Sequence, residues 1–158
     1  MKSVRTFLTL LILASTSVLS TPLFSHPSDQ QMNVIEWQTN YNNALAQAKQ
    51  KSLPVVLFFT GSDWCTWCNK IENEALDTPE FAQAADGKFI FVKLDYPMYK
   101  KLDGQTTQQN NSLKQKYDIK GYPTVIIIDS NERVLGSTGY VAGGGRNYAN
   151  HLRSIANQ

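Results

Sequence analysis

The chain has 158 residues, of which 42% are hydrophobic, and it carries 15 Lys and Arg against 13 Asp and Glu. This length fits one domain with a substantial core, and two cysteines are too few for a disulfide scaffold. Two of the basic residues, Lys2 and Arg5, lie in the N-terminal segment that is predicted below to be a leader. The rest of the chain is therefore formally neutral. Without a basic stripe to neutralise phosphates, we do not expect nucleic acid binding.

Residues 1–20 are typical of a secretory signal peptide. Lys2 and Arg5 precede residues 7–19, an uncharged and mostly apolar run that is shorter than the about 20 residues of a membrane-spanning helix. We expect cleavage between residues 20 and 25, which predicts a periplasmic or secreted protein. An uncleaved membrane anchor or a buried N-terminal helix is the alternative.

Residues 21–32 are predicted to form a flexible linker, and residues 33–158 a single domain. From Asn33, apolar residues recur at three- and four-residue steps, which predicts an amphipathic helix; they are Val34, Trp37, Tyr41, Leu45 and Ala48. Residues 55–60 (VVLFFT) form a short and almost wholly apolar run. Such a run is typical of a strand that is buried on both faces.

The rest of the domain alternates between helices and strands. We expect helices over residues 68–76, from Thr78–Pro79 onward, before Gly121, and from residues 143–145 to Ile155. We expect strands over residues 89–94, 124–128 and 133–137. Residues 95–111 are polar and turn-rich, and are expected to be a solvated connection, with a specificity loop as the alternative. This order of elements predicts an α/β fold.

Both cysteines lie in GSDWCTWCN, residues 61–69, separated by two residues. A structural zinc site needs four nitrogen or sulfur ligands, and the sequence offers only His26 and His151 besides the cysteines. We therefore expect no metal. A disulfide that closes a four-residue loop adds only about 2 kcal/mol of stability, so a purely structural bridge is a weak alternative.

Thiol–disulfide exchange, in contrast, requires this spacing. With Cys65 at the N-cap of a helix and Cys68 in its first turn, the two sulfurs can form a disulfide with little backbone change. The helix N-terminus favours the thiolate of the first cysteine, which attacks a substrate disulfide, and the second thiol resolves the mixed disulfide. The chemistry uses no cofactor beyond this redox-active pair.

Two segments carry a family resemblance. Residues 54–68 (PVVLFFTGSDWCTWC) resemble the strand and WCxxC site of thioredoxin-like proteins, and residues 116–129 (KYDIKGYPTVIIID) resemble their cis-proline segment. The chain is similar in particular to secreted single-domain oxidoreductases of the DsbH type. This resemblance covers about residues 33–157. It implies a thioredoxin-like fold, with a central mixed β-sheet flanked by helices on both faces.

The resemblance also implies roles for individual residues. Cys65 is the expected nucleophile and Cys68 the resolving thiol. Five neighbours are expected to contact the substrate: Trp64, Thr66, Trp67, Tyr122 and Pro123. Pro123 would be the cis-proline, with a trans proline at a strand start as the alternative. For the two tryptophans, packing against the protein is the alternative.

The chain departs from thioredoxins in the strand before the site. Thioredoxins have a buried aspartate there, whereas the corresponding residues 57–59 are Leu-Phe-Phe. Lys93 resembles the lysine that partners this aspartate, although a side chain that points outward along the sheet is the alternative. Glu72, one turn after Cys68, is the second candidate for proton-transfer support, with solvent exposure as its alternative.

The residues between the cysteines indicate the direction of electron flow. Thr66 and Trp67 carry no charge and no imidazole, which favours a less stabilised thiolate and a more reducing pair. We expect a monomeric periplasmic disulfide reductase of exported proteins, recycled by a membrane protein that relays electrons. The alternatives are an oxidase or isomerase with the same site, and a non-enzymatic module that binds client peptides or copper.

Overall fold

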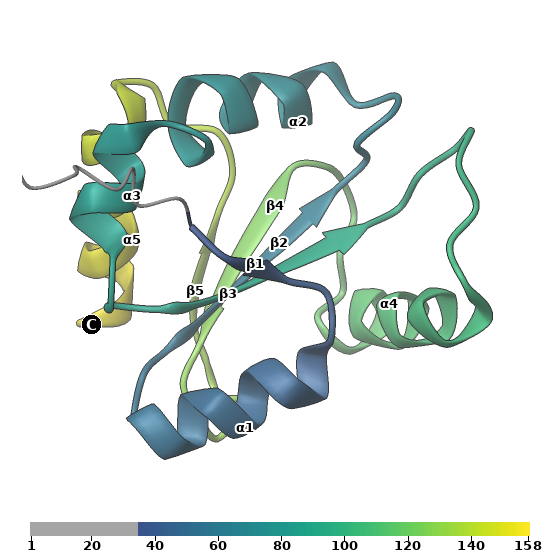
Figure 1. Cartoon of the computed structure of the whole chain (residues 1–158), viewed down its shortest axis with the longest axis horizontal. Helices are drawn as coiled ribbons and strands as arrows, with labels where there is room; N and C mark the ends of the chain where they lie inside the picture. Colours follow the sequence, from purple (N-terminus) through teal and green to yellow (C-terminus); the bar gives the residue numbers. More distant parts are fainter. Residues whose placement is uncertain (1–34) are drawn as a thin grey trace, which may run out of the picture. The chain divides into compact units, whose positions relative to one another are not determined.

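The structure, a computed structural model of the chain, describes residues 35–158. At its centre lies a five-stranded sheet in the order β1-β3-β2-β4-β5 (Figure 1). The strands are β1 (Trp37–Gln38), β2 (Val55–Thr60), β3 (Ile90–Asp95), β4 (Thr124–Ile128) and β5 (Val134–Thr138). Strands β1, β3 and β2 are parallel to one another, whereas β4 is antiparallel to both β2 and β5. The sheet is therefore mixed.

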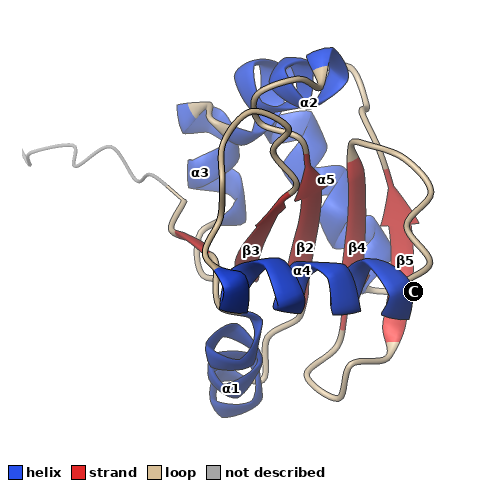
Figure 2. Ribbon diagram, turned by 90° about the vertical axis from the view of Figure 1, so that its right-hand side faces the viewer, coloured by secondary structure: helices blue, strands red, loops and turns tan. Residues whose placement is uncertain are grey.

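Helices cover both faces of the sheet, which confirms the predicted fold class (Figure 2). One face packs against α1 (Tyr41–Lys51) and α4 (Gly104–Lys116). The other face packs against α2 (Thr66–Ile71), α3 (Pro79–Ala85) and α5 (Gly144–Ala156). A π-helical turn, η1 (Glu72–Leu76), continues α2 directly.

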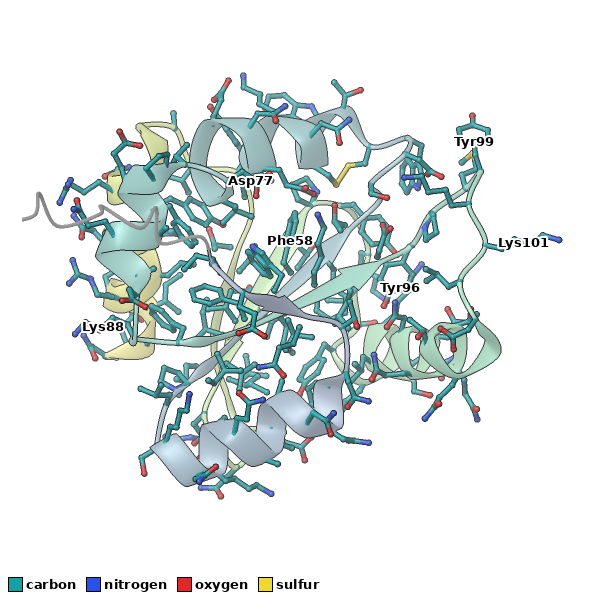
Figure 3. The ribbon with its side chains drawn as sticks, viewed as in Figure 1. Phe58, Asp77, Lys88, Tyr96, Tyr99 and Lys101 are labelled. Carbon is teal, nitrogen blue, oxygen red and sulfur yellow. A yellow bond between two sulfur atoms is a disulfide. The ribbon has the colours of Figure 1, made fainter. Side chains whose placement is uncertain are left out.

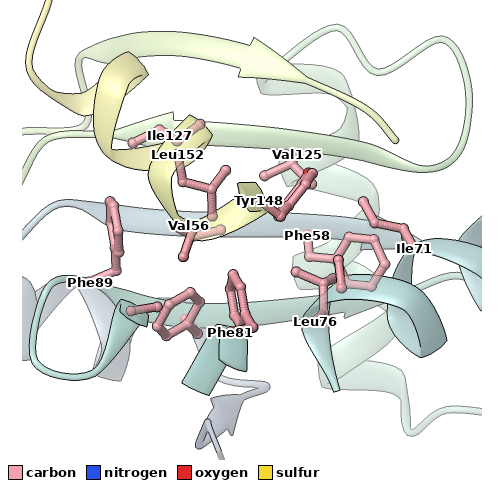
Figure 4. Packing of buried hydrophobic residues seen from close by; sticks show 14 of the residues in the cluster. Val56, Phe58, Ile71, Leu76, Phe81, Phe89, Val125, Ile127, Tyr148 and Leu152 are labelled. Atoms are coloured by element: carbon pink, nitrogen blue, oxygen red, sulfur yellow. The ribbon is translucent and has the colours of Figure 1, made fainter. Parts of the chain in front are cut away.

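Strand β2 is buried along its whole length because the two sides of its pleat face different cores. Val56 and Phe58 pack into the cluster beneath α2, α3 and α5 (Figure 4). Val55, Leu57 and Phe59 pack into the cluster beneath α1 and α4. A strand with both faces covered needs apolar residues at every position, which explains the continuous run in the sequence. The strand leads straight into the segment that contains the cysteines.

The first helix of the domain begins at Tyr41, so the prediction of a helix from Asn33 was wrong. The Asn40 side chain caps α1 by accepting a backbone hydrogen bond from its first turn. Trp37 instead lies in β1, with its ring centroid 5.2 Å from that of Phe91. Its spacing from later apolar residues fits a helix, but pairing with β3 packs the ring against the sheet. Tertiary packing thus decides the conformation.

Helix α4 occupies much of the segment that was predicted to be a connection. It begins at Gly104, where the Asp103 carboxylate caps it by accepting the backbone N–H of Thr106 at 2.9 Å. Its buried residues are Asn110 and Leu113, and most of its other side chains are polar and at least partly exposed. With so few apolar residues, the helix leaves little periodic signal in the sequence.

The predicted signal peptide, residues 1–20, and the predicted linker, residues 21–32, lie outside the described residues. Within residues 35–158, none of the helices is both long and apolar enough to span a bilayer.

Candidate active site

Cys65 and Cys68 form a disulfide at the start of α2 (Figure 3). Cys65 is the N-cap residue, and its sulfur accepts a hydrogen bond from the backbone N–H of Cys68 at 3.2 Å. The two Cα atoms are 5.2 Å apart, within the range usual for disulfides. This is the placement that the sequence predicts, with one cysteine at the cap and the other in the first turn.

The two cysteines differ in exposure. Cys65 is 6% exposed, whereas Cys68 is completely buried. Disulfide exchange requires direct contact between the attacking and the attacked sulfur. An external disulfide can therefore reach the Cys65 side of the pair more readily than the Cys68 side.

A tight turn carries the chain from β2 to the cysteines. The backbone N–H of Cys65 donates to the carbonyl of Gly61 at 2.9 Å. The indole ring of Trp64 packs over this turn, and a Cβ atom at position 61 would come within 2.4 Å of the ring. Glycine at this position thus allows Trp64 to lie against the backbone beside Cys65.

The second segment of the site is the loop before β4. The Tyr122–Pro123 peptide bond is cis, the conformation that the resemblance implies. The Tyr122 ring lies edge-on to that of Trp64, with centroids 5.6 Å apart. The Tyr122 hydroxyl is buried and has no hydrogen-bond partner among the described residues. The fold thus brings the loop with the cis Tyr122–Pro123 bond against Trp64, the residue before Cys65.

Trp67 combines the two alternatives stated for it, exposure to a substrate and packing against the protein. It is 56% exposed, yet its ring packs against Tyr140, with centroids 5.5 Å apart. The ammonium group of Lys70 lies 4.9 Å from the Trp67 ring centroid and 5.0 Å from that of Tyr140. Thr66, at the first position of α2, is exposed.

Sequence reasoning missed two aromatic residues of the site. Tyr140 follows β5 and supports Trp67, and Tyr96 follows β3 and packs against Tyr122 with centroids 5.2 Å apart. The carbonyl of Tyr96 also accepts the Trp64 indole N–H at 2.8 Å. Tyr96 could have been found from its position, because it directly follows a parallel strand next to β2, at the edge where open α/β sheets bind ligands.

Glu72 and Lys93 form an ion pair, with the ammonium nitrogen 2.6 Å from a carboxylate oxygen. The hydroxyl of buried Thr60 donates to the other carboxylate oxygen at 3.2 Å. The side chains of Glu72 and Lys93 are only 15% and 30% exposed. The stated alternatives, a solvated Glu72 and a Lys93 that points outward, were therefore wrong. Mutual neutralisation and the Thr60 hydrogen bond allow both charges to lie between η1 and the sheet.

The Glu72–Lys93 pair supplies a carboxylate, whereas strand β2, which precedes the cysteines, contains none. Lys93 lies opposite Phe58 in the register of β2 and β3, and Phe58 contributes only an apolar ring to the core. The carboxylate comes instead from the helix, at position i+4 relative to Cys68. Side chains at this spacing lie on the same helix face, so Glu72 is on the face that carries the buried thiol.

Residues 35–158 contain no group of three or more His, Cys, Asp and Glu side chains placed to hold a metal ion. His151, one of the two histidines weighed as zinc ligands, lies in α5 and forms a hydrogen bond with the Thr138 hydroxyl at 2.9 Å. His26 lies outside the described residues.

Comparison with known proteins gives a consistent result. A family model described as thioredoxin-like matches residues 36–130. The disulfide bond reductase DsbH of Chlamydia pneumoniae is 35% identical over 120 residues, which are 76% of this chain and 72% of that protein. The thioredoxin-related protein DsbJ of the same organism is 34% identical over 117 residues, which are 74% of this chain but 34% of DsbJ.

Solved structures agree with these matches. A DsbH oxidoreductase structure superposes with a TM-score of 0.75 at 29% identity, over 91% of this chain and 95% of the other. The C-terminal domain of Neisseria meningitidis DsbD in its oxidised form superposes with a TM-score of 0.51 at 20% identity, over 77% and 99%. At that identity the second likeness shows a shared fold alone.

Proposed function

The chain belongs to the thioredoxin-like family, and from this premise we propose that it is a thiol–disulfide oxidoreductase that acts mainly as a reductase of exported proteins. The observation that carries the proposal is the asymmetric pair at the start of α2. Cys65 retains some exposure, Cys68 has none, and the cis Tyr122–Pro123 bond lies in the adjoining loop.

In the reduced enzyme, Cys65 is the nucleophile. In the disulfide its sulfur accepts the backbone N–H of Cys68 at a helix N-terminus, and after reduction the same two features would favour its thiolate. The thiolate attacks one sulfur of a client disulfide, so that a Cys65–client bond forms as the client S–S bond breaks. The departing client thiolate then takes a proton from solvent.

Cys68 completes the reaction. After losing its proton, its sulfur attacks the Cys65 sulfur, which forms the Cys65–Cys68 disulfide and releases the second client thiolate. The pair has then lost two electrons and the client has gained them. The buried position of Cys68 keeps it from reacting with an external disulfide itself, so that it attacks only the mixed disulfide at Cys65.

We assign Glu72 to the removal of the Cys68 proton. Its carboxylate lies on the same helix face as Cys68 and is held by hydrogen bonds from Lys93 and Thr60. Lys93 and Thr60 act as positioning residues in this assignment. A carboxylate supplied by the helix thus does the work for which thioredoxins use an aspartate in the strand.

The client is expected to bind along the exposed rim of the cysteine pair. Tyr122 and Pro123 provide the backbone against which an extended client segment lies. Trp64, Thr66 and Trp67 are all exposed beside the pair, so they are available to contact the client on its other side.

The reductase direction follows from the residues between the cysteines, Thr66 and Trp67, which carry no charge. In the periplasm such an enzyme needs an electron source, and we propose a membrane protein that relays electrons. The similarity to a disulfide bond reductase supports this direction. We further propose that the protein acts as a monomer after cleavage of its signal peptide.

A trapping experiment tests the proposal. The Cys68→Ser variant cannot resolve the mixed disulfide, so it should accumulate a client–Cys65 adduct on non-reducing gels when mixed with a disulfide-containing protein such as insulin. The Cys65→Ser variant should accumulate far less, because the buried Cys68 cannot reach the client.

The double variant, Cys65→Ser with Cys68→Ser, separates an enzyme from a binding module. We expect it to lose both the adduct and insulin reduction. Client capture that persists in the double variant would instead show a non-enzymatic module, and stoichiometric Cu(I) bound by the reduced wild-type protein would indicate copper delivery.

A further inference from the structure

Three consecutive residues before Cys65 bind the segment that follows β3. Ser62 donates through its backbone N–H and its hydroxyl to the two carboxylate oxygens of Asp95, at 2.9 and 2.7 Å. The Trp64 indole N–H donates to the carbonyl of Tyr96 at 2.8 Å. The whole stretch from Ser62 to Trp64 is therefore tied to the chain that leaves the neighbouring strand.

Asp63 makes the most extensive of these contacts. One carboxylate oxygen accepts the backbone N–H of Met98 at 2.8 Å. The other accepts the N–H groups of Tyr99 and Lys100 at 2.9 and 3.0 Å. Charge-assisted hydrogen bonds of this kind are about twice as strong as neutral ones. Asp63 thus fixes three consecutive backbone groups two residues before the nucleophile.

The segment fixed in this way presents apolar side chains to solvent. Met98 is 63% exposed and Tyr99 is 77% exposed, and Figure 3 shows Tyr99 at the tip of the segment. Five large hydrophobic residues are exposed within residues 35–158, and four of them belong to the cysteine motif or to this tip: Trp64, Trp67, Met98 and Tyr99. The fifth, Val134, pairs with Ile128 at the far end of β4 from Pro123.

A hollow of about 310 Å³ lies beside the segment, lined among others by Pro97, Leu102 and Asn110. The three hydrogen bonds to Asp63 tie the tip of the segment to the cysteine motif. A contact with a purely structural role would bury apolar side chains, whereas this one fixes the backbone of Met98 and Tyr99 to Asp63, two residues from Cys65, and leaves both side chains exposed to solvent. Clustered exposed apolar residues on a soluble domain mark a contact surface.

We infer that Met98 and Tyr99 are specificity-determining residues for client disulfides, and that Asp63 is the positioning residue that holds them beside Cys65. The inference rests on the proposed function and deepens it. The preferred client is an extended polypeptide segment with an apolar side chain next to the attacked cysteine. That side chain packs against Met98 and Tyr99 while the backbone lies along Tyr122 and Pro123.

The test uses the reduced full-length protein and three disulfides. Two are short peptides in which a single cysteine forms a mixed disulfide with 2-mercaptoethanol, flanked by leucines in one and by serines in the other. The third is bis(2-hydroxyethyl) disulfide, which has no side chain to recognise. Second-order rates come from stopped-flow tryptophan fluorescence, since Trp64 and Trp67 adjoin the pair.

The wild-type protein should react about tenfold faster with the leucine peptide than with the serine peptide, the ratio expected from burying about 60 Å² of apolar surface. The Met98→Ser/Tyr99→Ser variant should lose this preference and keep its rate with bis(2-hydroxyethyl) disulfide within about twofold. Asp63→Asn should lose most of the preference for the leucine peptide, while the reduction potential of its cysteine pair stays unchanged. A merely structural role of Asp63 would not predict this combination. Val134→Ser, the matched control, should keep the preference.

Equal wild-type rates with both peptides, or a preference that survives in the Met98→Ser/Tyr99→Ser variant, would overturn the inference while leaving the enzyme intact. Failure of the proposed function is distinguishable, because the wild-type protein would then react with none of the three disulfides. Circular dichroism of each variant excludes loss of the fold as the cause of a lost preference.

Discussion

The fold exposes two sulfur atoms that are close in the chain to different extents, which is the basis of the different tasks proposed for them. Cys65 caps the helix and keeps some contact with solvent, whereas Cys68 lies inside the first turn with none. Their spacing alone predicts this difference, since the N-cap and the first turn of a helix differ in exposure wherever a helix packs on a sheet. The placement of the cysteines could therefore be predicted from local sequence, whereas the cis proline was implied only by the family resemblance, with a trans proline left open.

The partnership of Glu72 with Lys93 could not be predicted in the same way. Each residue is charged and could have been solvated, and their contact depends on how η1 lies over β3. The hydrogen bond from Thr60 adds a third element to the arrangement. Sequence reasoning identified both residues by their positions relative to Cys68 and to β3, but their contact required the tertiary structure.

Replacement of Glu72 tests its assigned role. Glu72→Gln should slow the resolution of a preformed mixed disulfide at neutral pH by on the order of tenfold. This loss is smaller than the roughly 10²–10⁴-fold rate contribution of general acid–base catalysis, because solvent can replace the carboxylate in part. The deficit should shrink as pH rises, because hydroxide then competes with the carboxylate for the Cys68 proton. Single-turnover release of client measures this step.

Glu80→Gln is the matched control, because Glu80 is exposed in the first turn of α3 and makes the same change of charge. It should resolve the mixed disulfide as fast as the wild-type protein does. A Glu72→Gln deficit that stays constant across pH would show that the residue supports structure and does not take the proton.

At the scale of elements, the sequence is informative where local signals and tertiary packing agree. Thr78 and Pro79 predict the start of α3, and the Thr78 hydroxyl does accept the backbone N–H of Phe81 at 3.2 Å. The two signals disagree at Trp37, whose helical spacing is overridden by pairing with β3. In α4 the apolar signal is too weak to show the first two turns, and the Asp103 cap is the better evidence.

The segment held by Asp63 should respond to acid in a defined way. Partial desolvation raises the pKa of Asp63, but the N–H groups of Met98, Tyr99 and Lys100 lower it, and the net pKa lies below its usual value. A carboxyl group whose pKa is lowered in the folded state stabilises the fold above its unfolded-state pKa of about 3.9. This contribution is lost as pH falls through the lower, folded-state value.

We therefore predict that residues 98–100 keep their position at all pH values above about 3.9. The amide NMR signals of Tyr99 and Lys100 should titrate with a midpoint below that value, and Asp63→Asn should abolish the titration. A midpoint above about 3.9, or the same titration in Asp63→Asn, would contradict the assignment of Asp63 as the group that holds the segment.

At the scale of the whole molecule, the order of strands is what places the site. Because β2 lies at the centre of the sheet, its end delivers the cysteines between the end of β3 and the start of β4. Tyr96, from the loop after β3, and Tyr122, from the loop before β4, then both contact Trp64. The continuous apolar run of β2 predicts its central position, since only a strand covered on both faces tolerates such a run.

The alternation of strands and helices was sufficient to predict the fold class, and the resemblance supplied the mixed sheet. The resemblance implied a role for Tyr122, but neither signal predicted that Tyr96 and Tyr140, from two other loops, would join the aromatic surroundings of the site. Their contacts with Trp64 and Trp67 exist only once the whole sheet has formed.

The equilibrium reduction potential of the Cys65–Cys68 pair, measured against a dithiothreitol series, tests the central claim most directly. A reductase with uncharged Thr66 and Trp67 between its cysteines should lie near the thioredoxin value of about −270 mV. A potential near the DsbA value of about −120 mV would contradict the account and make the protein an oxidase.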